Sequence, residues 1–518
     1  MASRIILGRN SCKAAETGLQ HIGTFILFSG PKHGKIVVCY VASWAVYRPA
    51  PGSYALEDLE PDLCTHIVYS FAGLNPDTNA IKSLDPWQDL EKDYGKAGYK
   101  RLVALKKKYP HLKVTLAIGG WNEGSPKYSN MASKAESREI FIKSVMNILN
   151  NYEFDGLDLD WEYPTKRDGQ PFDKENFVML VKELKEAFEP KGYILTAALG
   201  AGKETMESAY DLTKLSRYLD LLHMMCYDYH GTWDGFVGAN APLRGASEFD
   251  TLSVEYTIKY MLSQGVSPYK LVMGLPMYGR TFELVDPATR RIEFGKTPVK
   301  SKGFQGPYTK EDGFMGYNEV CGEIKNSSSW RQYWHDGSST PYLRDKNGRG
   351  DRVISYDNGR SIAMKVKMAM DYGLGGLMVW SIDTDDFKGD CPGEVDPYVD
   401  FVERHKRMAQ DPLLTKAVEN LHLPNGKLGT SPGYQTSGNG QLELHLPEPQ
   451  YTNYHLMQTI NDAISLSLEE KAIIDAMERV TKENELVPEE KSDKASSCNI
   501  GSSFALVAMA LGVLVIHF

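Results

Sequence analysis

The chain has 518 residues, 42% apolar and 24% charged, a composition typical of a globular protein with a large core and not of a disordered chain. Its formal net charge of −9 argues against nucleic acid as the main partner, because phosphate binding needs a surplus of Lys and Arg. The seven cysteines contain no Cys-x-x-Cys pair and the twelve histidines no His-x-x-x-His pair, so we expect neither a metal site nor a cofactor.

The first segment, residues 1–34, differs in composition from the rest of the chain. Basic residues precede a short apolar run at 22–28, which is the order found in secretory signal peptides. Glu16 and His21 interrupt that order, and the apolar run is short. We therefore expect a leader over 1–34, which a weak secretory signal and an alternative or misassigned start explain equally well.

From 35 to about 405 the sequence repeats one unit, a short β-branched or apolar run followed by a longer helix-like segment. This alternation is typical of parallel strands joined by crossover helices. The expected strands cover residues 36–41, 65–71, 113–118, 156–161, 193–198, 220–227, 271–277 and 376–382. Eight such units predict an α/β fold, a closed (β/α)₈ TIM barrel over 35–405, whose active site lies at the C-terminal ends of the strands.

One interval breaks this spacing. Residues 281–353 separate the seventh expected strand from the last helix and the eighth strand, and they carry irregular, strand-like pieces. Barrels tolerate insertions in these loops. We therefore expect an insertion domain here that raises one wall of a groove.

The region after about 405 has a different character. Residues 423–440 are rich in Pro, Gly, Ser and Asn, which is the composition of a linker. Residues 455–482 place Leu456, Ile460 and Ile464 at helical spacing, which predicts one or two amphipathic helices. We expect 406–503 to form a linker and a helical extension whose role the sequence does not reveal.

The chain ends in a hydrophobic tail, 504–518, with thirteen consecutive apolar residues from 504 to 516. About twenty are needed to span a bilayer as a helix, so the tail is short for a transmembrane anchor. Small residues at 495–498 precede it, as in a GPI-attachment signal, although the polar spacer is shorter than usual. The alternative is an apolar tail that packs on the protein. We expect membrane contact only through such an anchor or tail.

Three acids follow one another on the fourth expected strand. Successive side chains of a strand alternate between its faces, so Asp158, Asp160 and Glu162 share one face, opposite Leu157 and Leu159. Ionised carboxylates lose hydration on burial unless they are paired or protonated, and neighbouring like charges titrate together. A carboxyl group kept protonated at neutral pH is what acid cleavage of a glycosidic bond requires.

A hard-cation site and a solvated loop are the alternatives for these acids. A magnesium or calcium site needs oxygen ligands that converge on one point, whereas a strand spreads same-face residues by roughly 7 Å per pair. We therefore favour a catalytic cleft.

The run that starts at Asp155, Asp-Gly-Leu-Asp-Leu-Asp-Trp-Glu-Tyr-Pro, resembles the signature of family 18 glycoside hydrolases, the chitinase family. The resemblance covers about 35–405 and implies a small α+β insertion domain at 281–353. It implies that Glu162 protonates the leaving oxygen, that Asp160 orients the substrate acetamide, and that Asp158 shares a proton behind it. It also implies that Tyr227 donates its hydroxyl group to that acetamide, while Asp155 supports the strand.

Aromatic side chains recur near the expected strand ends, and such side chains stack on the flat faces of sugar rings. By position and by the resemblance, the substrate-binding residues are Tyr40, Trp44, Phe71, Gly120, Trp121, Tyr163, Met225, Asp228, Trp233, Tyr278, Arg280 and Trp380. Trp380 matches the floor of the cleavage subsite.

The resemblance also implies two disulfides, Cys39 with Cys64 and Cys321 with Cys391. Cys226 is expected to be a buried free thiol, and Cys12 and Cys498 are unassigned. Asn326 begins an Asn-Ser-Ser sequon, which suits a secreted glycoprotein.

Together these features predict an endo-acting chitinase that binds chitin and chitooligosaccharides, acts as a monomer, and is secreted or held at the cell surface. The alternatives are a chitinase-like lectin or growth factor that has lost the acid, and an endo-β-N-acetylglucosaminidase. The presence of Glu162 favours an enzyme over the lectin.

Overall fold

The computed structural model describes residues 30–325, 328–345, 350–391, 396–419, 433–436, 442–447 and 453–486. The leader up to residue 29, most of the expected linker, the sequon residue Asn326 and the C-terminus with its hydrophobic tail lie outside this range, as do Cys12 and Cys498. Within it, no helix combines the length and the apolar character needed to cross a bilayer.

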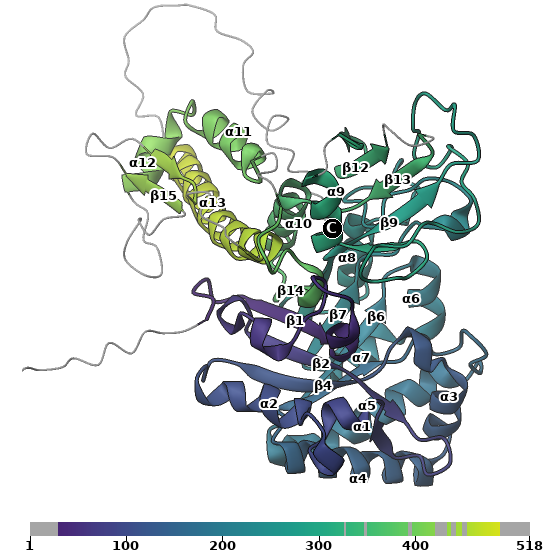
Figure 1. Ribbon diagram of the computed structural model, residues 1–518. Helices are drawn as coiled ribbons and strands as arrows, with labels where there is room; N and C mark the ends of the chain where they lie inside the picture. The colour runs from purple at the N-terminus through teal and green to yellow at the C-terminus, as the bar shows by residue number, and fades with distance from the viewer. Residues whose placement is uncertain are drawn as a thin grey trace, which may run out of the picture.

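A closed barrel of eight parallel strands forms the centre of the molecule (Figure 1). Its strands are β1 (Ile36–Ala42), β2 (His66–Leu74), β4 (Lys113–Gly119), β5 (Gly156–Asp160), β6 (Ile194–Gly200), β7 (Leu221–Met225), β8 (Leu271–Pro276) and β14 (Gly376–Trp380). The first strand pairs with β14 on one side and with β2 on the other, which closes the ring. The predicted (β/α)₈ barrel is confirmed, with each strand within a few residues of its expected position.

Helices surround the barrel and bury the outward faces of the strands. The main ones are α2 (Gly98–Ala104), α4 (Ala135–Tyr152), α5 (Asp173–Phe188), α7 (Leu212–Tyr218), α8 (Val254–Ser263) and α10 (Gly359–Asp371). Shorter elements occupy the loops: β3 (Ile81–Ser83), α1 (Pro86–Asp89), α3 (Pro126–Ala132) and α6 (Lys203–Ala209). Helix α4 buries Phe141, Val145 and Leu149, one side chain per turn, in the same core as Leu157 and Leu159 of β5.

The interior of the barrel is apolar toward the N-terminal ends of the strands and polar toward their C-terminal ends. Val38, Val68, Leu221, Val272 and Met378 form a small buried cluster in its interior. Because side chains alternate along β5, the residues opposite Leu157 and Leu159 point into the barrel, where Asp158 and Asp160 are buried. The fold thus carries the acids at the C-terminal end of the barrel.

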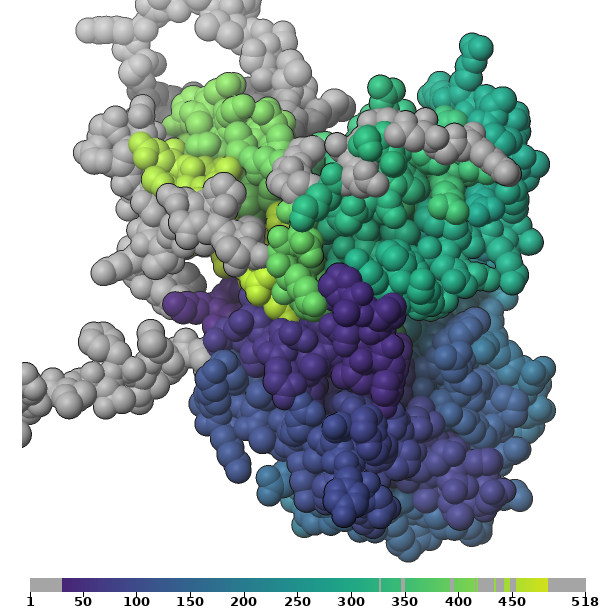
Figure 2. Space-filling view, in the orientation of Figure 1, coloured from purple at the N-terminus to yellow at the C-terminus, as the bar shows by residue number. Residues whose placement is uncertain are grey.

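The insertion between β8 and β14 is a small α+β domain. It contains β9 (Tyr278–Glu283), β10 (Phe314–Gly316), α9 (Tyr317–Lys325), β11 (Trp330–His335), β12 (Thr340–Asp345) and β13 (Arg352–Ser355), with sheet order β10-β9-β13-β12-β11. The buried Glu319 carboxylate of α9 accepts hydrogen bonds from the Thr309 hydroxyl group and the Gly316 N–H, both at 2.7 Å. In Figure 2 the insertion forms a lobe that stands over the barrel.

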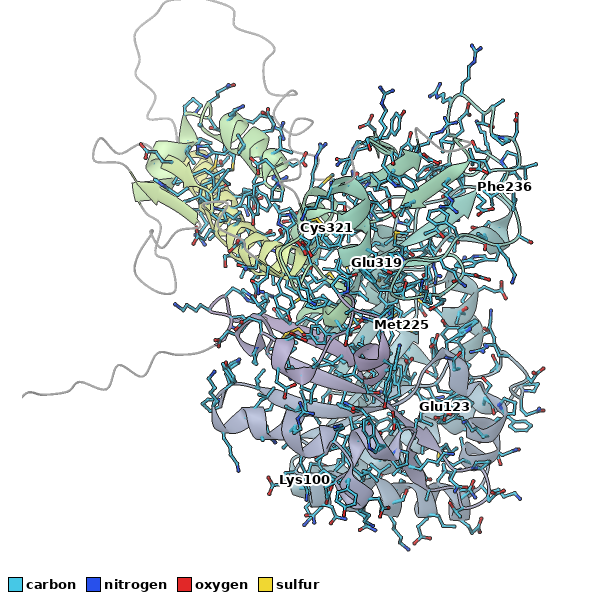
Figure 3. All side chains as sticks on the ribbon, viewed as in Figure 1. Lys100, Glu123, Met225, Phe236, Glu319 and Cys321 are labelled. Carbon is cyan, nitrogen blue, oxygen red and sulfur yellow. A yellow bond between two sulfur atoms is a disulfide. The ribbon has the colours of Figure 1, made fainter. Side chains whose placement is uncertain are left out.

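Two disulfides brace these parts. Cys39 of β1 is joined to Cys64, just before β2, and Cys321 of α9 is joined to Cys391, which follows the loop after β14 (Figure 3). These are the pairs that the resemblance implies. Cys226 is a buried free thiol.

The C-terminal segment returns to the barrel. It comprises α11 (Val399–Met408), α12 (Leu413–Glu419), the hairpin β15 (Gly433–Thr436) and β16 (Leu442–His445), and one long helix, α13 (His455–Leu486). Leu456, Ile460 and Ile464 of α13 are buried in the main core, and α13 lies along α10. The sequence predicted one or two helices here but not their place in the core of the barrel domain.

Candidate active site

The Asp158 carboxylate lies inside the barrel with no exposed surface. The hydroxyl group of Tyr40 donates to its Oδ2 at 2.6 Å, and that of Thr196 donates to its Oδ1 at 2.5 Å. His223 Nδ1 lies 3.2 Å from Oδ1. Three strands therefore converge on this carboxylate and fix it in place.

Asp160 is the next acid along the same face, and it is also buried. Its Oδ1 has no hydrogen-bond partner within the described part of the chain. Burial, followed by the charges of Glu162 and Asp158, raises the pKa of Asp160 well above its usual value. A buried carboxyl oxygen without a partner is costly, and this oxygen can accept a hydrogen bond from a bound substrate.

Glu162 stands two residues beyond the end of β5, and its side chain is partly buried. Burial is the main reason why the pKa of Glu162 is raised to about 7, and the Asp228 carboxylate adds to it. A hydrogen bond with Tyr163 and the positive charge of Arg167 act in the opposite direction. At neutral pH a large share of Glu162 therefore carries the proton that an acid catalyst needs.

The strand end after β7 supplies a second group of side chains. Tyr227 packs against the barrel-interior cluster together with Met225, which lies in the middle of the molecule in Figure 3. The Tyr278 hydroxyl group donates to Asp228 Oδ1 at 2.7 Å, and Arg280 Nε donates to the same oxygen at 2.8 Å. Asp228 therefore ties the end of β7 to β9 of the insertion.

Four aromatic rings lie together at the mouth of the barrel. Trp380 stacks on Phe71 with ring centroids 5.6 Å apart, and Phe71 stacks on Trp44 at 6.0 Å. Tyr40 meets Trp380 edge-on at 5.7 Å. Gly120 has a φ of +88°, and a Cβ there would lie 2.7 Å from Phe71, so the glycine permits this close packing.

Two further tryptophans are exposed at the rim. Trp121 is 58% exposed and Trp233 is 59% exposed. The guanidinium group of Arg167 lies 3.6 Å from the ring centre of Trp121, and that of Arg280 lies 5.1 Å from Trp233. Each indole is thus supported by a cation and offers apolar surface to a ligand.

The predicted catalytic and substrate-binding residues lie on the barrel strands or in the segments that follow them, except Tyr278 and Arg280, which lie on β9 of the insertion. Asp155 is separate from them, because its carboxylate accepts a hydrogen bond from the Val114 N–H at 2.7 Å and supports the neighbouring strand, as expected. Tyr163 lies beside Glu162, with its carbonyl group accepting a hydrogen bond from Ser125 at 2.8 Å.

Sequence reasoning missed Thr196, His223 and Arg167. His223 precedes Met225 by two residues on β7, so strand alternation alone places both on one face. Thr196 is the register partner of Asp158, which requires the strand pairing to be known. Arg167 donates to the carbonyl groups of Trp121 at 2.7 Å and of Glu162 at 3.1 Å from an irregular loop, which carries no periodic signal.

Two other features of the described residues do not compete with this site. Cys321, Asp386 and Cys391 lie close enough to resemble a metal cluster, but the two sulfur atoms are joined in a disulfide. A cavity of about 210 Å³ lies between the insertion and the loop after β14, lined in part by Tyr308 and Lys388, and none of the predicted site residues lines it.

Comparison with known proteins gives consistent matches. Residues 36–385 match the family model of Glycosyl hydrolases family 18. The chain is 45% identical over 491 residues to Probable chitinase 2 of Drosophila melanogaster, covering 93% of this chain and 92% of that protein.

Solved structures agree. The Group IV chitinase of Ostrinia furnacalis in complex with allosamidin is 40% identical, with a TM-score of 0.65, and the match covers 72% of this chain and 99% of that one. Human YKL-39, described as a pseudo-chitinase with retained chitooligosaccharide binding, is 32% identical, with a TM-score of 0.62 over 71% of this chain and 99% of that one. The same fold therefore occurs in enzymes and in a pseudo-enzyme.

Proposed function

The chain belongs to the glycosyl hydrolases of family 18, and we propose that it is an endo-acting chitinase that retains the β-configuration at the cleaved carbon. The proposal is carried by two features of the same strand end: burial raises the pKa of Glu162 to about 7, and two residues before it the buried Asp160 Oδ1 has no hydrogen-bond partner within the described residues. Because YKL-39 shares the fold, family membership alone does not decide between enzyme and lectin. An acid with a pKa of about 7 favours the enzyme.

In the first step Glu162 transfers its proton to the glycosidic oxygen as the C1–O bond breaks. The carbonyl oxygen of the substrate's own N-acetyl group attacks C1, which forms a cyclic oxazolinium ion. Asp160 accepts a hydrogen bond from the acetamide nitrogen through its free oxygen and offsets the positive charge of the ring. The Tyr227 hydroxyl group donates to the acetamide oxygen.

In the second step Glu162, now a carboxylate, removes a proton from a water molecule that attacks C1 and opens the ring. Two successive displacements retain the configuration. Asp158, held by Tyr40 and Thr196, stays in place behind Asp160, and its charge is one of the causes that raise the pKa of Asp160.

The endo mode of attack is supported by the distribution of aromatic side chains. Trp44, Phe71 and Trp380 form a stacked group. Trp121 and Trp233 are exposed on loops after two other strands, β4 and β7. A ligand that contacts both sets meets aromatic side chains from five strands or the loops after them, which suits a polymer bound along its length. The ligands of this site would thus be chitin and chitooligosaccharides.

A hydrolysis assay on soluble N-acetylglucosamine oligomers tests the proposal. Glu162→Gln keeps the shape of the side chain but removes the proton, and loss of positioned acid catalysis costs about 10² to 10⁴-fold in rate. Glu139→Gln serves as the control. Glu139 lies on the exposed face of α4, where it pairs with Lys143, so this variant should keep wild-type turnover. Hydrolysis by Glu162→Gln at the wild-type rate would contradict the role of Glu162 as the catalytic acid.

We also propose that the protein is secreted or held at the cell surface. The two disulfides support an oxidising compartment. If residues 504–518 direct lipid attachment, their deletion moves the protein from the cell surface to the medium, and a phosphatidylinositol-specific phospholipase releases the full-length protein. Surface protein that resists this phospholipase would contradict a GPI anchor.

A further inference from the structure

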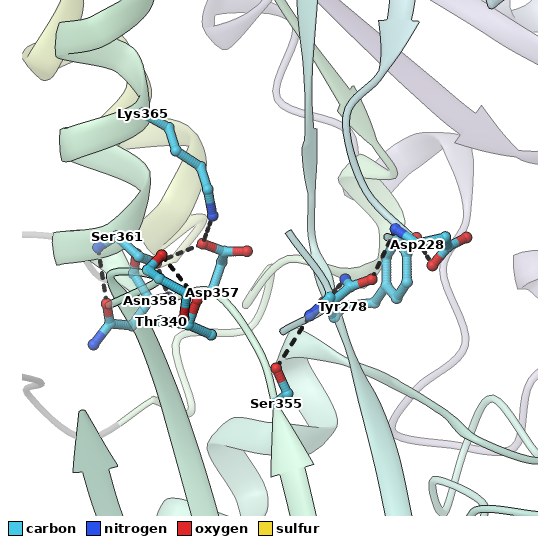
Figure 4. A network of polar contacts seen from close by, with 10 residues as sticks. Asp228, Tyr278, Thr340, Ser355, Asp357, Asn358, Ser361 and Lys365 are labelled. Carbon is cyan, nitrogen blue, oxygen red and sulfur yellow. Dashed lines mark hydrogen bonds and ion pairs between the residues drawn. The ribbon is translucent and has the colours of Figure 1, made fainter. Parts of the chain in front are cut away.

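Asn240 is a fully buried polar residue in the loop before α8. Its Oδ1 accepts a hydrogen bond from the Asp228 N–H at 3.0 Å, and its Nδ2 donates to the Tyr278 carbonyl at 3.2 Å. Its own N–H donates to Ser355 Oγ at 3.2 Å, and its carbonyl accepts from the Tyr229 N–H at 3.0 Å. Asn240 therefore connects the end of β7, β9 and β13. Figure 4 labels three of the residues that it contacts, Asp228, Tyr278 and Ser355.

The residues that Asn240 holds include predicted substrate-binding residues. Asp228 has a φ of +56°, a left-handed conformation that a non-glycine residue keeps only when its surroundings impose it. Its carboxylate is held by the Tyr278 hydroxyl group and by Arg280. Its backbone N–H is held by Asn240, so the side chain and the backbone of Asp228 are fixed from two directions.

We propose that Asn240 is a positioning residue of the catalytic site, which fixes Asp228 and the start of β9 and so sets where the Asp228 carboxylate stands relative to Glu162. This inference rests on the proposed glycoside hydrolysis. An apolar residue at 240 would leave the Asp228 N–H and the Tyr278 carbonyl without these partners. A residue that only filled space in the core would need neither the hydrogen-bond acceptor nor the donor that the Asn240 amide provides.

The position of Asp228 has a measurable consequence for Glu162. Negative charge on Asp228 raises the pKa of Glu162, after the larger effect of burial. The charged and titratable groups that face Glu162 are Asp160, Tyr163, Arg167, Tyr210, Tyr227 and Asp228. Of these, Asp228 is the one whose backbone Asn240 holds, so displacement of Asp228 lowers the pKa of Glu162 and moves the alkaline limb of activity to lower pH.

The test compares the wild type with Asn240→Ala, Asn240→Asp and the control Asn358→Ala. Asn358 lies in the same polar region (Figure 4) but caps α10, with Oδ1 accepting from the Ser361 N–H at 3.0 Å. For each protein, kcat and KM for chitotetraose are measured from pH 4 to 9, together with the melting temperature. Binding of chitotetraose is followed separately by tryptophan fluorescence.

We expect Asn240→Ala to lower kcat by roughly 10 to 100-fold, because a small misplacement of catalytic groups has effects of that size. Its alkaline limb moves to lower pH. Asn358→Ala lowers the melting temperature without moving that limb. In Asn240→Asp a protonated carboxyl group makes both bonds that the amide makes, so kcat approaches the wild-type value at acidic pH and falls as the new acid ionises.

Wild-type kcat and an unshifted limb in folded Asn240→Ala would overturn the proposal. If that variant does not fold, Asn240→Asp decides, since a defect that is equal at all pH values contradicts a positioning role. A wild type that hydrolyses nothing would reject the proposed function instead. In that case binding decides the role of Asn240, because weaker binding in Asn240→Ala supports it and unchanged binding overturns it.

Discussion

At the scale of single residues, burial separates the roles of the acids. Asp158 has two hydroxyl donors, Asp160 keeps an oxygen without a partner, and Glu162 lies past the strand end, where burial raises its pKa to about 7. The sequence predicted that the three acids share a face and titrate together. It could not show which of them is bonded, because Tyr40 and Thr196 reach Asp158 from other strands.

The raised pKa of Glu162 predicts the alkaline limb of the pH profile. A general acid works only while protonated, so kcat/KM should fall about tenfold per pH unit above the pKa, which is about 7. Arg167 lowers this pKa, so Arg167→Gln should move the limb to higher pH. Initial rates on chitotetraose from pH 4 to 9 give the alkaline limb of the wild type and of Arg167→Gln. An alkaline limb that stays in place or moves to lower pH in Arg167→Gln would contradict this role of Glu162.

At the scale of secondary structure, the strands and the C-terminal helix were predictable from the sequence, but the packing of that helix on the barrel domain was not. The strands follow from β-branched and apolar runs, which carry a local signal, as at Ile36–Ala42. Helix α13 also shows its apolar spacing in the sequence. Its contact with α10 joins residues about a hundred positions apart, which no local pattern encodes.

Helix α13 is attached to the loop after Trp380. The Asp385 carboxylate accepts hydrogen bonds from the N–H groups of Leu456 at 3.3 Å and Met457 at 2.9 Å. Asp383 in the same loop pairs with Arg48 at 2.7 Å, which links it to the loop that carries Trp44. The C-terminal helix thus supports two loops that present groove aromatics.

This attachment predicts that Asp385→Ala destabilises the whole barrel domain. Loss of a capping carboxylate costs about 1 kcal/mol, and more where buried N–H groups lose their partner. Asp211→Ala removes the cap of α7, where Asp211 accepts from the Lys214 N–H at 3.1 Å, and serves as the control. Both variants should melt at a lower temperature, but only Asp385→Ala should also raise KM for long oligomers. An unchanged KM in Asp385→Ala would show that α13 does not support the loops that bind the substrate.

At the scale of the whole molecule, the insertion and the C-terminal helix are both attached to the segment that follows β14 of the barrel. The insertion is joined to the eighth loop by the Cys321–Cys391 disulfide, and Asp228 is bonded to β9 by Tyr278 and Arg280. The barrel supplies the acids, and the insertion supplies the two side chains that hold the Asp228 carboxylate. The chemistry proposed for this site requires a substrate that carries its own nucleophile.

The anomeric form of the first product, together with the need for an N-acetyl group, tests whether the substrate acetamide is the nucleophile. Wild-type enzyme is mixed with chitotetraose and followed by proton NMR within minutes, before the new reducing end mutarotates, alongside an oligomer deacetylated at the sugar of the cleavage subsite. We expect initial β product, a slower reaction in Tyr227→Phe, and no cleavage of the deacetylated oligomer at that sugar. Initial α product, or equal cleavage of the deacetylated oligomer, would contradict this role of the acetamide.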